Sequence, residues 1–312
     1  MKYGVKIKRV LQICSVGLLS VGLVACQNNQ SSEKHSENRA VTDAGGHKIE
    51  VPTNPKRVLG SYLEDPLVAL GVTPVAQWSV SNGVQDYLKD DLKNVPKISY
   101  DLPFEAVQKT NPDLILMDSS SMVEGGKYEQ YSKIAPTYVV GKAKNNDWRK
   151  ELQEVGKVLN KKDDAQKLID NYDEKVKDAK AKLAENKEVP SAAAIWLVNN
   201  KLFISSKDLS SGDVLYNDLG LKVPKVVQEI SENTENNWNP ISLEKLADLD
   251  ADYIFLVNSD KNGASTLSNS IWKNIPAVKN NHVAEFPKSS SWLYTGVIAN
   301  DQIVDDVLKT IK

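Results

Sequence analysis

The longest regular pattern of hydrophobic and polar positions in this chain lies near its middle, in residues 163–187. Apolar side chains recur there at steps of three and four, and neither Gly nor Pro interrupts them. The apolar stripe comprises Leu168, Tyr172, Val176, Ala179 and Leu183. This spacing predicts one helix with Asp163 as its N-cap and, at about 1.5 Å per residue, a length of roughly 36 Å. An unbroken helix of that length is expected to be a rigid connector between two lobes.

Two similar groups of residues flank this connector. Glu105 opens a short amphipathic segment, and Asp113 precedes a buried strand. Glu244 and Asp252 repeat the pair at the same spacing on the other side. The repetition indicates that the two halves of the chain have related folds.

Helix and strand patterns alternate on both sides of the connector. The expected strands are residues 56–60, 74–78, 114–117, 192–198, 201–204, 253–257 and 282–286. The expected helices are residues 65–71, 212–219 and 296–311, and residues 41–51 are expected to form a hairpin. Gly71 and Gly220 end two helices where a left-handed residue is favoured. The alternation predicts an α/β fold of two similar lobes, each with a mainly parallel sheet flanked by helices.

The first 26 residues carry the pattern of a secretion signal. Four basic residues precede an apolar run that is too short for a stable membrane span. The run ends in Leu-Val-Ala-Cys at residues 23–26, which resembles the bacterial lipobox, in which the Cys becomes the lipidated first residue. Cys26 is therefore the expected lipidation site, and residues 27–40 are expected to be a flexible polar tether. Cys14 is the other cysteine and lies within the removed segment.

Charge and motif content argue against several classes of function. The signal segment holds four of the 39 basic residues and no acidic one, so its removal leaves 35 basic against 41 acidic residues, a net charge of −6. Nucleic acid is not an expected partner of such a chain. No spacing joins His35, His47 and His282, so direct metal capture is not expected. Motifs of serine hydrolases, nucleotide-binding enzymes and zinc proteases do not occur.

In combination, these features resemble the solute-binding lipoproteins that deliver ferric siderophores, haem or cobalamin to ABC importers. The resemblance rests on motifs in residues 55–58, 70–72, 105–115, 131–137, 163–187 and 272–279, behind the lipobox. It implies lobes at residues 41–162 and 188–312, joined by the rigid helix at 163–187. The ligand would lie in the cleft between the lobes, which would rock slightly instead of closing widely. The resemblance implies a binding protein and not an enzyme.

Ligands of open parallel sheets gather beyond the carboxyl ends of the strands. The loops that leave the expected strands are rich in aromatic and hydroxyl side chains, which suit a bulky ligand with few polar atoms. The candidate ligand-binding residues are Tyr62, Trp78, Tyr100, Ser119, Trp196, Asn199, Ser205, Trp292 and Tyr294. Trp292 and Tyr294 are expected in the cleft because residues 289–295 are too polar for a core. Three other tryptophans are expected away from the strand exits, namely Trp148, Trp238 and Trp272.

Arginine is scarce after the signal segment, and this scarcity bears on the charge of the ligand. Arg39, Arg57 and Arg149 are expected in the tether, at a strand start and at a helix opening, so none is expected in a pocket loop. Carboxylate and catecholate siderophores call for several guanidinium groups that pair with them bidentately. The expected ligand is therefore a ferric hydroxamate siderophore, with haem and ferric citrate or catecholate complexes as alternatives. Hydroxamate binders of the family often carry an Arg in the loop that corresponds to residues 208–212, and this chain does not.

Glu105 and Glu244 have two interpretations. As an acid–base pair across a cleft, they would indicate a glycosidase-like enzyme. In the family that the chain resembles, one such Glu on each lobe pairs with arginines of a transporter subunit, which implies docking on a permease dimer. The chain itself would be a monomer without a cofactor, held by the lipid at Cys26 on the extracytoplasmic face of the cell membrane.

Overall fold

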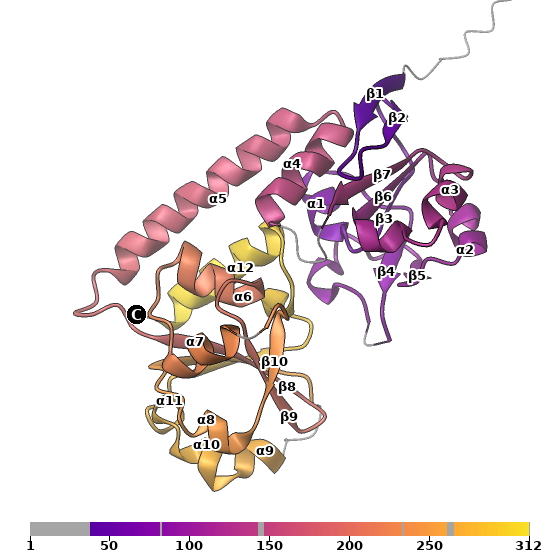
Figure 1. The fold of residues 1–312 in the computed structure, drawn as a ribbon. Coiled ribbons are helices and arrows are strands. Elements are labelled where there is room, and N and C mark those ends of the chain that lie inside the picture. Colours follow the sequence, from indigo (N-terminus) through magenta and orange to yellow (C-terminus); the bar gives the residue numbers. More distant parts are fainter. Residues whose placement is uncertain (1–37, 82, 143–146, 233, 261–264, 312) are drawn as a thin grey trace, which may run out of the picture. The chain divides into compact units, whose positions relative to one another are not determined.

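The computed structural model describes residues 38–81, 83–142, 147–232, 234–260 and 265–311. The expected signal peptide, Cys26 and most of the expected tether lie outside these residues. The described chain folds into two α/β lobes joined by a long helix, α5 (Figure 1). No helix in the described ranges has both the length and the apolar character that a membrane crossing requires.

The N-terminal lobe is built on a parallel sheet of three strands, in the order β3-β6-β7. The sheet comprises β3 (Val58–Gly60), β6 (Leu114–Ser119) and β7 (Thr137–Gly141). A smaller parallel pair consists of β4 (Gln77–Ser79) and β5 (Lys97–Ser99), and an antiparallel hairpin consists of β1 (Asn38–Thr42) and β2 (Lys48–Pro52). The helical elements are α1 (Glu64–Ala69), η1 (Asp86–Leu88), α2 (Phe104–Lys109), η2 (Ser120–Val123), α3 (Lys127–Ser132) and α4 (Trp148–Val158). The parallel order places the exits of β3 and β6 side by side, where the Ser61 hydroxyl donates to the Asp118 carboxylate at 2.6 Å.

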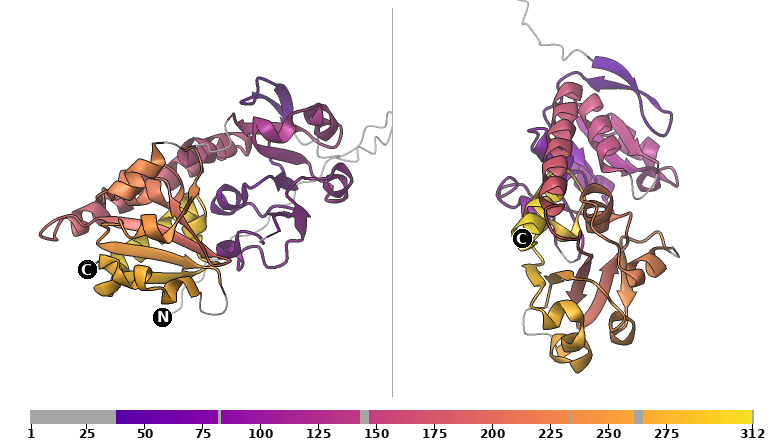
Figure 2. Two further views of the ribbon diagram at one scale, coloured as in Figure 1. Left: turned by 60° about the horizontal axis from the view of Figure 1, so that its bottom comes forward. Right: turned by 90° about the vertical axis from the view of Figure 1, so that its left-hand side faces the viewer.

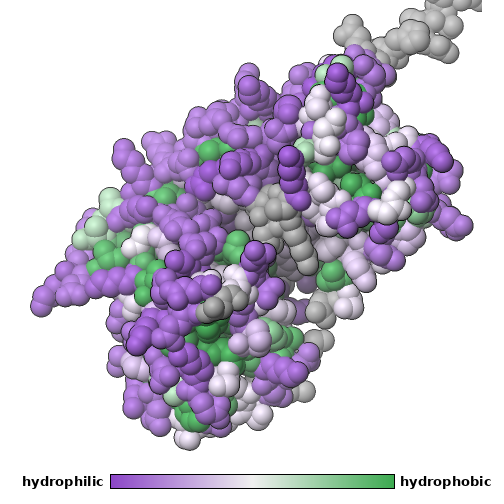
Figure 3. Space-filling model, viewed as in Figure 1, coloured by the Kyte–Doolittle hydropathy of each residue, from purple (hydrophilic) through white to green (hydrophobic). Residues whose placement is uncertain are grey.

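The connector is α5 (Lys162–Leu183), which extends from the N-terminal lobe to the C-terminal lobe in both views of Figure 2. Four residues of the expected apolar stripe are buried in it, Tyr172, Val176, Ala179 and Leu183, whereas Leu168 is half-buried. The outer face of the helix is hydrophilic, as Figure 3 shows for this side of the molecule. The prediction of Asp163 as N-cap is wrong, because α5 follows a tight turn after α4 and begins at Lys162.

The C-terminal lobe contains a five-stranded mixed sheet in the order β10-β9-β8-β11-β12. Its strands are β8 (Ala192–Val198), β9 (Lys201–Ser205), β10 (Trp238–Ile241), β11 (Tyr253–Asn258) and β12 (Val283–Pro287). Strands β8, β11 and β12 are parallel, whereas β9 is antiparallel to both β8 and β10. The helical elements are α6 (Ser210–Gly212), the π-helix η3 (Asp213–Asp218), α7 (Lys225–Ser231), α8 (Leu243–Leu246), α9 (Ser265–Ser268), α10 (Ser270–Asn274), α11 (Pro276–Lys279), η4 (Ser291–Leu293) and α12 (Val297–Thr310).

The repeated sequence groups have the same structural role in both lobes. The Asp113 carboxylate accepts hydrogen bonds from the backbone N–H groups of Lys56 and Arg57, just before β3. The Asp252 carboxylate accepts one from the backbone N–H of Ser191, just before β8. Each Asp thus fixes the start of a neighbouring core strand. The two glycines expected at helix ends, Gly71 and Gly220, both adopt the left-handed conformation, each with a φ of +72°.

A carboxylate of the N-terminal lobe caps the last helix of the C-terminal lobe. Asp65, in α1, accepts hydrogen bonds from the backbone N–H groups of Ile298 (3.2 Å) and Ala299 (3.0 Å) in the first turn of α12. Its side chain occupies the space that a Cβ atom at Gly296 would need. The positive end of a helix dipole stabilises a buried carboxylate in this position. The lobes are therefore tied through this contact as well as through α5.

Three sequence expectations differ from the structure at the level of elements. Strand β1 begins at Asn38, inside the expected tether, and Arg39 donates to the backbone carbonyls of Lys157 and Val158 at 2.6 Å. The expected strand at 74–78 is the short β4, which lies outside the main sheet. Trp238 begins strand β10, where the sequence suggested a loop or a helix start. Polar edge strands such as β1 and β10 carry a weak hydrophobic pattern, which explains why they were missed.

Candidate functional site

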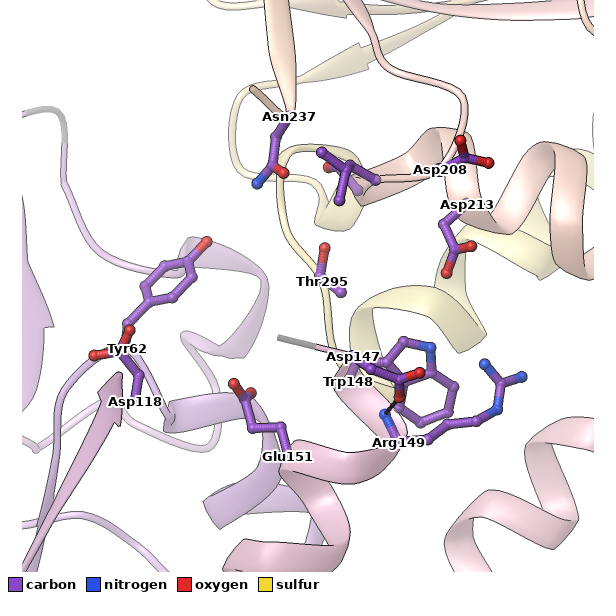
Figure 4. A pocket seen from close by; sticks show the side chains of 12 residues that line it. Tyr62, Asp118, Asp147, Trp148, Arg149, Glu151, Asp208, Asp213, Asn237 and Thr295 are labelled. Carbon is purple, nitrogen blue, oxygen red and sulfur yellow. Dashed lines mark hydrogen bonds between the residues drawn. The ribbon is translucent and has the colours of Figure 1, made fainter. Parts of the chain in front are cut away.

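A cavity of about 300 Å³ lies where the two lobes and α4 meet. The residues that line it come from the ends of β3 and β6, the first turn of α4, the loop after β9, the start of η3, the residue before β10 and the segment before α12. They are Tyr62, Asp118, Asp147, Trp148, Arg149, Glu151, Asp208, Leu209, Ser210, Asp213, Asn237 and Thr295. Figure 4 shows these side chains converging on the space from both lobes. A concave site with aromatic and polar walls is typical of a small-molecule pocket.

The first turn of α4 forms one wall of the cavity. Asp147 caps the helix by accepting hydrogen bonds from the backbone N–H groups of Arg149 (3.0 Å) and Lys150 (3.1 Å). Trp148 packs its ring edge-to-face on Tyr172 of α5, at 5.0 Å between centroids. The cap and this aromatic contact fix the direction in which the α4 residues face the cavity.

Arg149 lies on the cavity wall, contrary to the prediction that no arginine falls in the pocket. Its guanidinium group stacks on the Trp148 ring at 4.4 Å and forms ion pairs with Asp173 (2.7 Å) and Asp218 (3.1 Å). Tyr172 also donates a hydrogen bond to Asp218 at 2.7 Å. Because two carboxylates already match its charge, Arg149 adds little positive potential for an anionic ligand.

Two carboxyl groups on the N-terminal side are shifted in pKa. Burial raises the pKa of Glu151 to about 8, and repulsion from Asp118 and Asp65 adds to the shift. Burial also raises the pKa of Asp118, although the hydrogen bond from Ser61 acts in the opposite direction. In Figure 4 the Glu151 side chain points from α4 into the cavity. Because its pKa lies near neutral pH, the Glu151 carboxyl group can gain or lose a proton when a nearby charge is added or removed.

The loop after β9 forms the opposite wall and is tightly held. The Ser205 hydroxyl is buried, accepts a hydrogen bond from the backbone N–H of Gly212 (3.1 Å) and lies 3.3 Å from the carbonyl oxygen of Leu209. Gly212 has no room for a side chain, since a Cβ atom there would collide with the carbonyl oxygen of Ser206. Ser205 thus acts by positioning the loop that carries Asp208 and Ser210, instead of lining the cavity itself.

The structure brings three of the sequence-predicted aromatic residues together on the N-terminal lobe. Trp78 lies edge-on to Tyr62 at 5.1 Å and to Tyr100 at 6.3 Å, and its indole N–H donates to the Tyr100 carbonyl at 2.9 Å. Tyr62 is 38% exposed and Tyr100 is 56% exposed. Together with Val80, they are the large hydrophobic side chains that are exposed among the described residues. Tyr62 belongs to both this aromatic row and the cavity wall, so the row extends the site along the lobe surface.

The expectation that Trp292 faces the cleft is wrong. Its side chain is completely buried, stacked on Phe255 (4.6 Å) and Phe286 (5.2 Å), and its indole N–H donates to Asp306 at 3.1 Å. The serines around it lie in the turn, and they do not keep the ring out of the core. Tyr294, two residues later, donates a hydrogen bond from its hydroxyl to the Val84 carbonyl of the other lobe at 3.0 Å. Tyr294 is thus a contact between the lobes, beside the cavity residue Thr295.

Trp196 and Asn199 do not line the cavity. Trp196 packs against Phe203 (5.4 Å) and Trp238 (6.1 Å), and its indole N–H donates to Ser259 at 2.9 Å. Asn199 lies in the turn between β8 and β9. Because β9 runs antiparallel to β8, this turn and Ser205 lie at opposite ends of β9. The sequence argument treated every strand exit as one edge of a parallel sheet, which fails for a hairpin.

Ser119 is also buried, and its hydroxyl lies 2.9 Å from that of Ser121. Of the nine ligand-binding candidates, Tyr62 alone belongs to the described cavity lining. Sequence reasoning missed Trp148, Glu151 and Ser210. The start of α4 could have been found from the sequence, because Asp147 is a favourable N-cap residue, but nothing in the sequence placed that helix start at the cavity.

The two residues expected to dock on the permease, Glu105 and Glu244, lie outside the cavity lining. Glu105 lies in the first turn of α2 and Glu244 in the first turn of α8, one helix on each lobe, and both side chains are exposed. The arrangement gives no support to a glycosidase-like pair, which needs two carboxylates on either side of one bound sugar. Over the ranges that the structure describes, no group of three or more His, Cys, Asp or Glu side chains is placed to hold a metal ion.

Comparison with known proteins decides the family. The family model described as periplasmic binding protein matches residues 60–289. The chain belongs to the periplasmic binding protein family. This membership confirms the expected two-lobed α/β fold and the expectation of a binding protein, not an enzyme.

Individual members of the periplasmic binding protein family that resemble this chain carry iron-related names. The iron(3+)-hydroxamate-binding protein FhuD of Bacillus subtilis is 30% identical, over 85% of this chain and 86% of its own. The probable siderophore-binding lipoprotein YfiY of the same organism is 28% identical over 96% and 97%. The crystal structure of Staphylococcus aureus SirA complexed with staphyloferrin B is 31% identical, with a TM-score of 0.69 over 87% of this chain and 98% of SirA. These similarities confirm the resemblance drawn from the sequence.

Proposed function

We propose that this protein binds a ferric siderophore of the hydroxamate type in the cavity between its lobes and delivers it to the permease of an ABC importer. The observation that carries the proposal is the makeup of the cavity. Aromatic rings from Tyr62 and Trp148 offer apolar contact, whereas the single guanidinium group on its wall is paired with two carboxylates of the protein. Anionic siderophores require free guanidinium groups, and a neutral iron–hydroxamate core does not. The similarity to FhuD of Bacillus subtilis supports the same ligand class.

Capture and release require no chemical step in this proposal. The iron stays chelated by the siderophore, so the protein supplies only stacking, hydrogen bonds and shape. Continuous α5 and the Asp65 cap on α12 restrict the lobes to small relative movements. The permease would open the cavity by pulling on both lobes, docked through Glu105 on one and Glu244 on the other. A monomer with one carboxylate on each lobe suits a permease dimer.

Tryptophan fluorescence tests the ligand class directly. Ferric complexes absorb light and should quench Trp148 in the cavity wall and Trp78 in the aromatic row. The protein without residues 1–26 is titrated in parallel with ferrichrome, ferric citrate, a ferric catecholate, the ferric complex of staphyloferrin B, and haem. Saturable quenching by the hydroxamate at micromolar or lower concentration is expected, with at least about tenfold weaker binding of the others. If none of the siderophores quenches the tryptophan fluorescence, the proposed function is refuted.

We also propose that Cys26 carries the lipid that keeps the protein on the extracytoplasmic face of the cell membrane. The support is the lipobox at residues 23–26 and the relative named as a lipoprotein, and one lipid chain with a diacylglyceryl group suffices for stable anchoring. Cys26→Ala is expected to move the protein from the membrane fraction to the medium or to leave an unprocessed precursor. Cell fractionation with mass spectrometry reads this out. A variant that remains processed and membrane-bound would refute the anchor.

A further inference from the structure

The charge of the cavity is strongly one-sided. Five carboxylates line it against one guanidinium group, and no lysine belongs to the described lining. The acidic residues are Asp118, Asp147, Glu151, Asp208 and Asp213. Arg149 is already paired with Asp173 and Asp218, which lie behind the wall, and Lys207 offsets only Asp208, at 3.8 Å. Burial raises the pKa of Glu151 to about 8, so this group is largely protonated near pH 7 until a cation beside it favours the ionised form. A bound cation therefore meets a net negative surface.

The acidic side chains approach the space from both lobes. Glu151 projects from α4 and Asp118 lies near the end of β6 on the N-terminal side, whereas Asp213 begins η3 on the C-terminal side (Figure 4). No hydrogen bond or ion pair from another described residue reaches the Glu151 carboxylate. Asp213 accepts a hydrogen bond from the amide of Asn217 at 2.8 Å, and its charge is offset only in part by Arg149, which already pairs with Asp173 and Asp218. A cation between the lobes would thus face carboxylates on two sides.

An orphan hydroxyl group in the same wall indicates independently that the cavity is built for a polar ligand. Ser210 is 4% exposed, lines the cavity and has no hydrogen-bond partner for its Oγ atom among the described residues. Its backbone is held in the left-handed region, with a φ of +54°. A serine in this conformation costs about 1 kcal/mol, and a buried hydroxyl without a partner is unfavourable, so both features call for a compensating contact. A hydrogen-bonding group of a ligand would supply it.

We infer that the cavity selects ferric hydroxamate siderophores that carry a free ammonium group over neutral and anionic ones, with Glu151 and Asp213 as the discriminating carboxylates and Ser210 as a hydrogen-bonding partner. The inference rests on the proposed function and narrows its ligand class. Three hydroxamates neutralise the charge of iron(III), so the net charge of such a complex is set by its side groups. A pendant primary ammonium makes the complex cationic, and its acetylation makes it neutral without changing the iron core.

Ferrioxamine B and its N-acetyl derivative form a matched pair of ligands for the test, because they differ only at that amine. Their dissociation constants are measured by fluorescence quenching for the wild-type mature protein, for the double variant Glu151→Gln, Asp213→Asn, and for Glu174→Gln. Glu174 is an exposed carboxylate on α5 outside the cavity lining, and its variant is the control for removal of a carboxylate away from the cavity. Circular dichroism checks that the double variant is folded. Ferrichrome, which is neutral, and ferric citrate, which is anionic, complete the panel.

The wild type and Glu174→Gln are expected to bind ferrioxamine B about tenfold more tightly than the acetylated form. An affinity ratio of this size corresponds to one ion pair that is partly screened by solvent. The preference should shrink as salt is raised and should nearly vanish in the double variant. Equal affinity for the two ligands in the wild type, or a preference that survives in the double variant, would overturn the inference. Binding of ferrichrome but of neither ferrioxamine would also overturn it while leaving the proposed function intact. If none of the ferric hydroxamates binds to the wild-type protein, the proposed function itself is refuted.

Discussion

Replacing Glu105 and Glu244 together by alanine is expected to abolish siderophore uptake and to leave the dissociation constant of the ligand unchanged. Both side chains are exposed in the first turns of short helices, α2 and α8, where a carboxylate is compatible with the helix dipole and available to a partner. Neither touches the cavity, so ligand binding does not depend on them. If they pair with arginines of two permease subunits, each truncation leaves a buried charge without its partner in the docked complex, which costs about 2–5 kcal/mol per site.

Uptake of radioactive iron as the siderophore complex, in cells that depend on this protein, measures the effect. Each single variant should reduce uptake in part, and the double variant should reduce it to the background of a deletion strain. Glu174→Ala on α5 combined with Glu185→Ala in the turn after α5 is the matched control, because both side chains are exposed and the pair removes the same charge elsewhere. Uptake at the wild-type level in the Glu105/Glu244 double variant would eliminate the docking role.

The thermal stability of the protein is expected to decrease as the pH rises from about 5 to about 8. Glu64 is 2% exposed, and burial raises its pKa to about 8, despite a backbone hydrogen bond from Trp78. In the unfolded chain this carboxyl group loses its proton near its ordinary pKa of about 4.5. Between these values the unfolded state binds fewer protons than the folded state, so the free energy of unfolding falls with pH. The contribution of Glu64 is on the order of 3–5 kcal/mol across this window. Burial raises the pKa of Asp65 to about 6 and acts in the same direction.

Glu64→Gln removes the titrating proton and keeps an amide oxygen that can accept from Trp78, but its NH2 group cannot accept the hydrogen bond that Gln85 donates to Glu64 at 2.9 Å. That loss is the same at every pH, so the slope of stability against pH still reports the titration of Glu64. The midpoint of thermal unfolding is measured at pH 5, 6, 7 and 8 at constant ionic strength for the wild type, for Glu64→Gln and for Glu50→Gln, an exposed control in β2. Glu64→Gln should flatten the decline and should be more stable than the wild type at pH 8. A decline of equal slope in all three proteins would show that Glu64 is not its source.

Sequence reasoning succeeded for those parts of the fold that local chemistry determines. The apolar stripe of α5 depends on helical spacing alone, and the glycines after α1 and η3 depend on one backbone angle. The pairs that contain Asp113 and Asp252 are equivalent in the structure because each carboxylate caps a strand start a short distance away in space. The stripe and the glycines are encoded in short windows of sequence, whereas the two Asp contacts join residues that are 57 and 61 positions apart and were found from the repeated motif.

The cavity escaped prediction because distant segments create it. Trp148 and Glu151 face the ligand space only because α4 packs on α5 and places its first turn between the lobes. Ser205 and Asn199 are a few residues apart in sequence, yet the antiparallel pairing of β8 and β9 separates them. Trp292 was expected in the cleft because its sequence neighbours are polar, but its own ring is completely buried. Tyr62 was found because it directly follows a buried parallel strand, for which the rule of strand exits holds.

The location of iron in a crystal of the ferric hydroxamate complex tests the central claim most directly. The anomalous signal of iron identifies the metal without ambiguity. The account predicts iron in the cavity, with the siderophore in contact with Tyr62, Trp148 and Ser210. Iron bound instead beside Trp196, or beside Asn199 in the turn between β8 and β9, would contradict the assignment of the site.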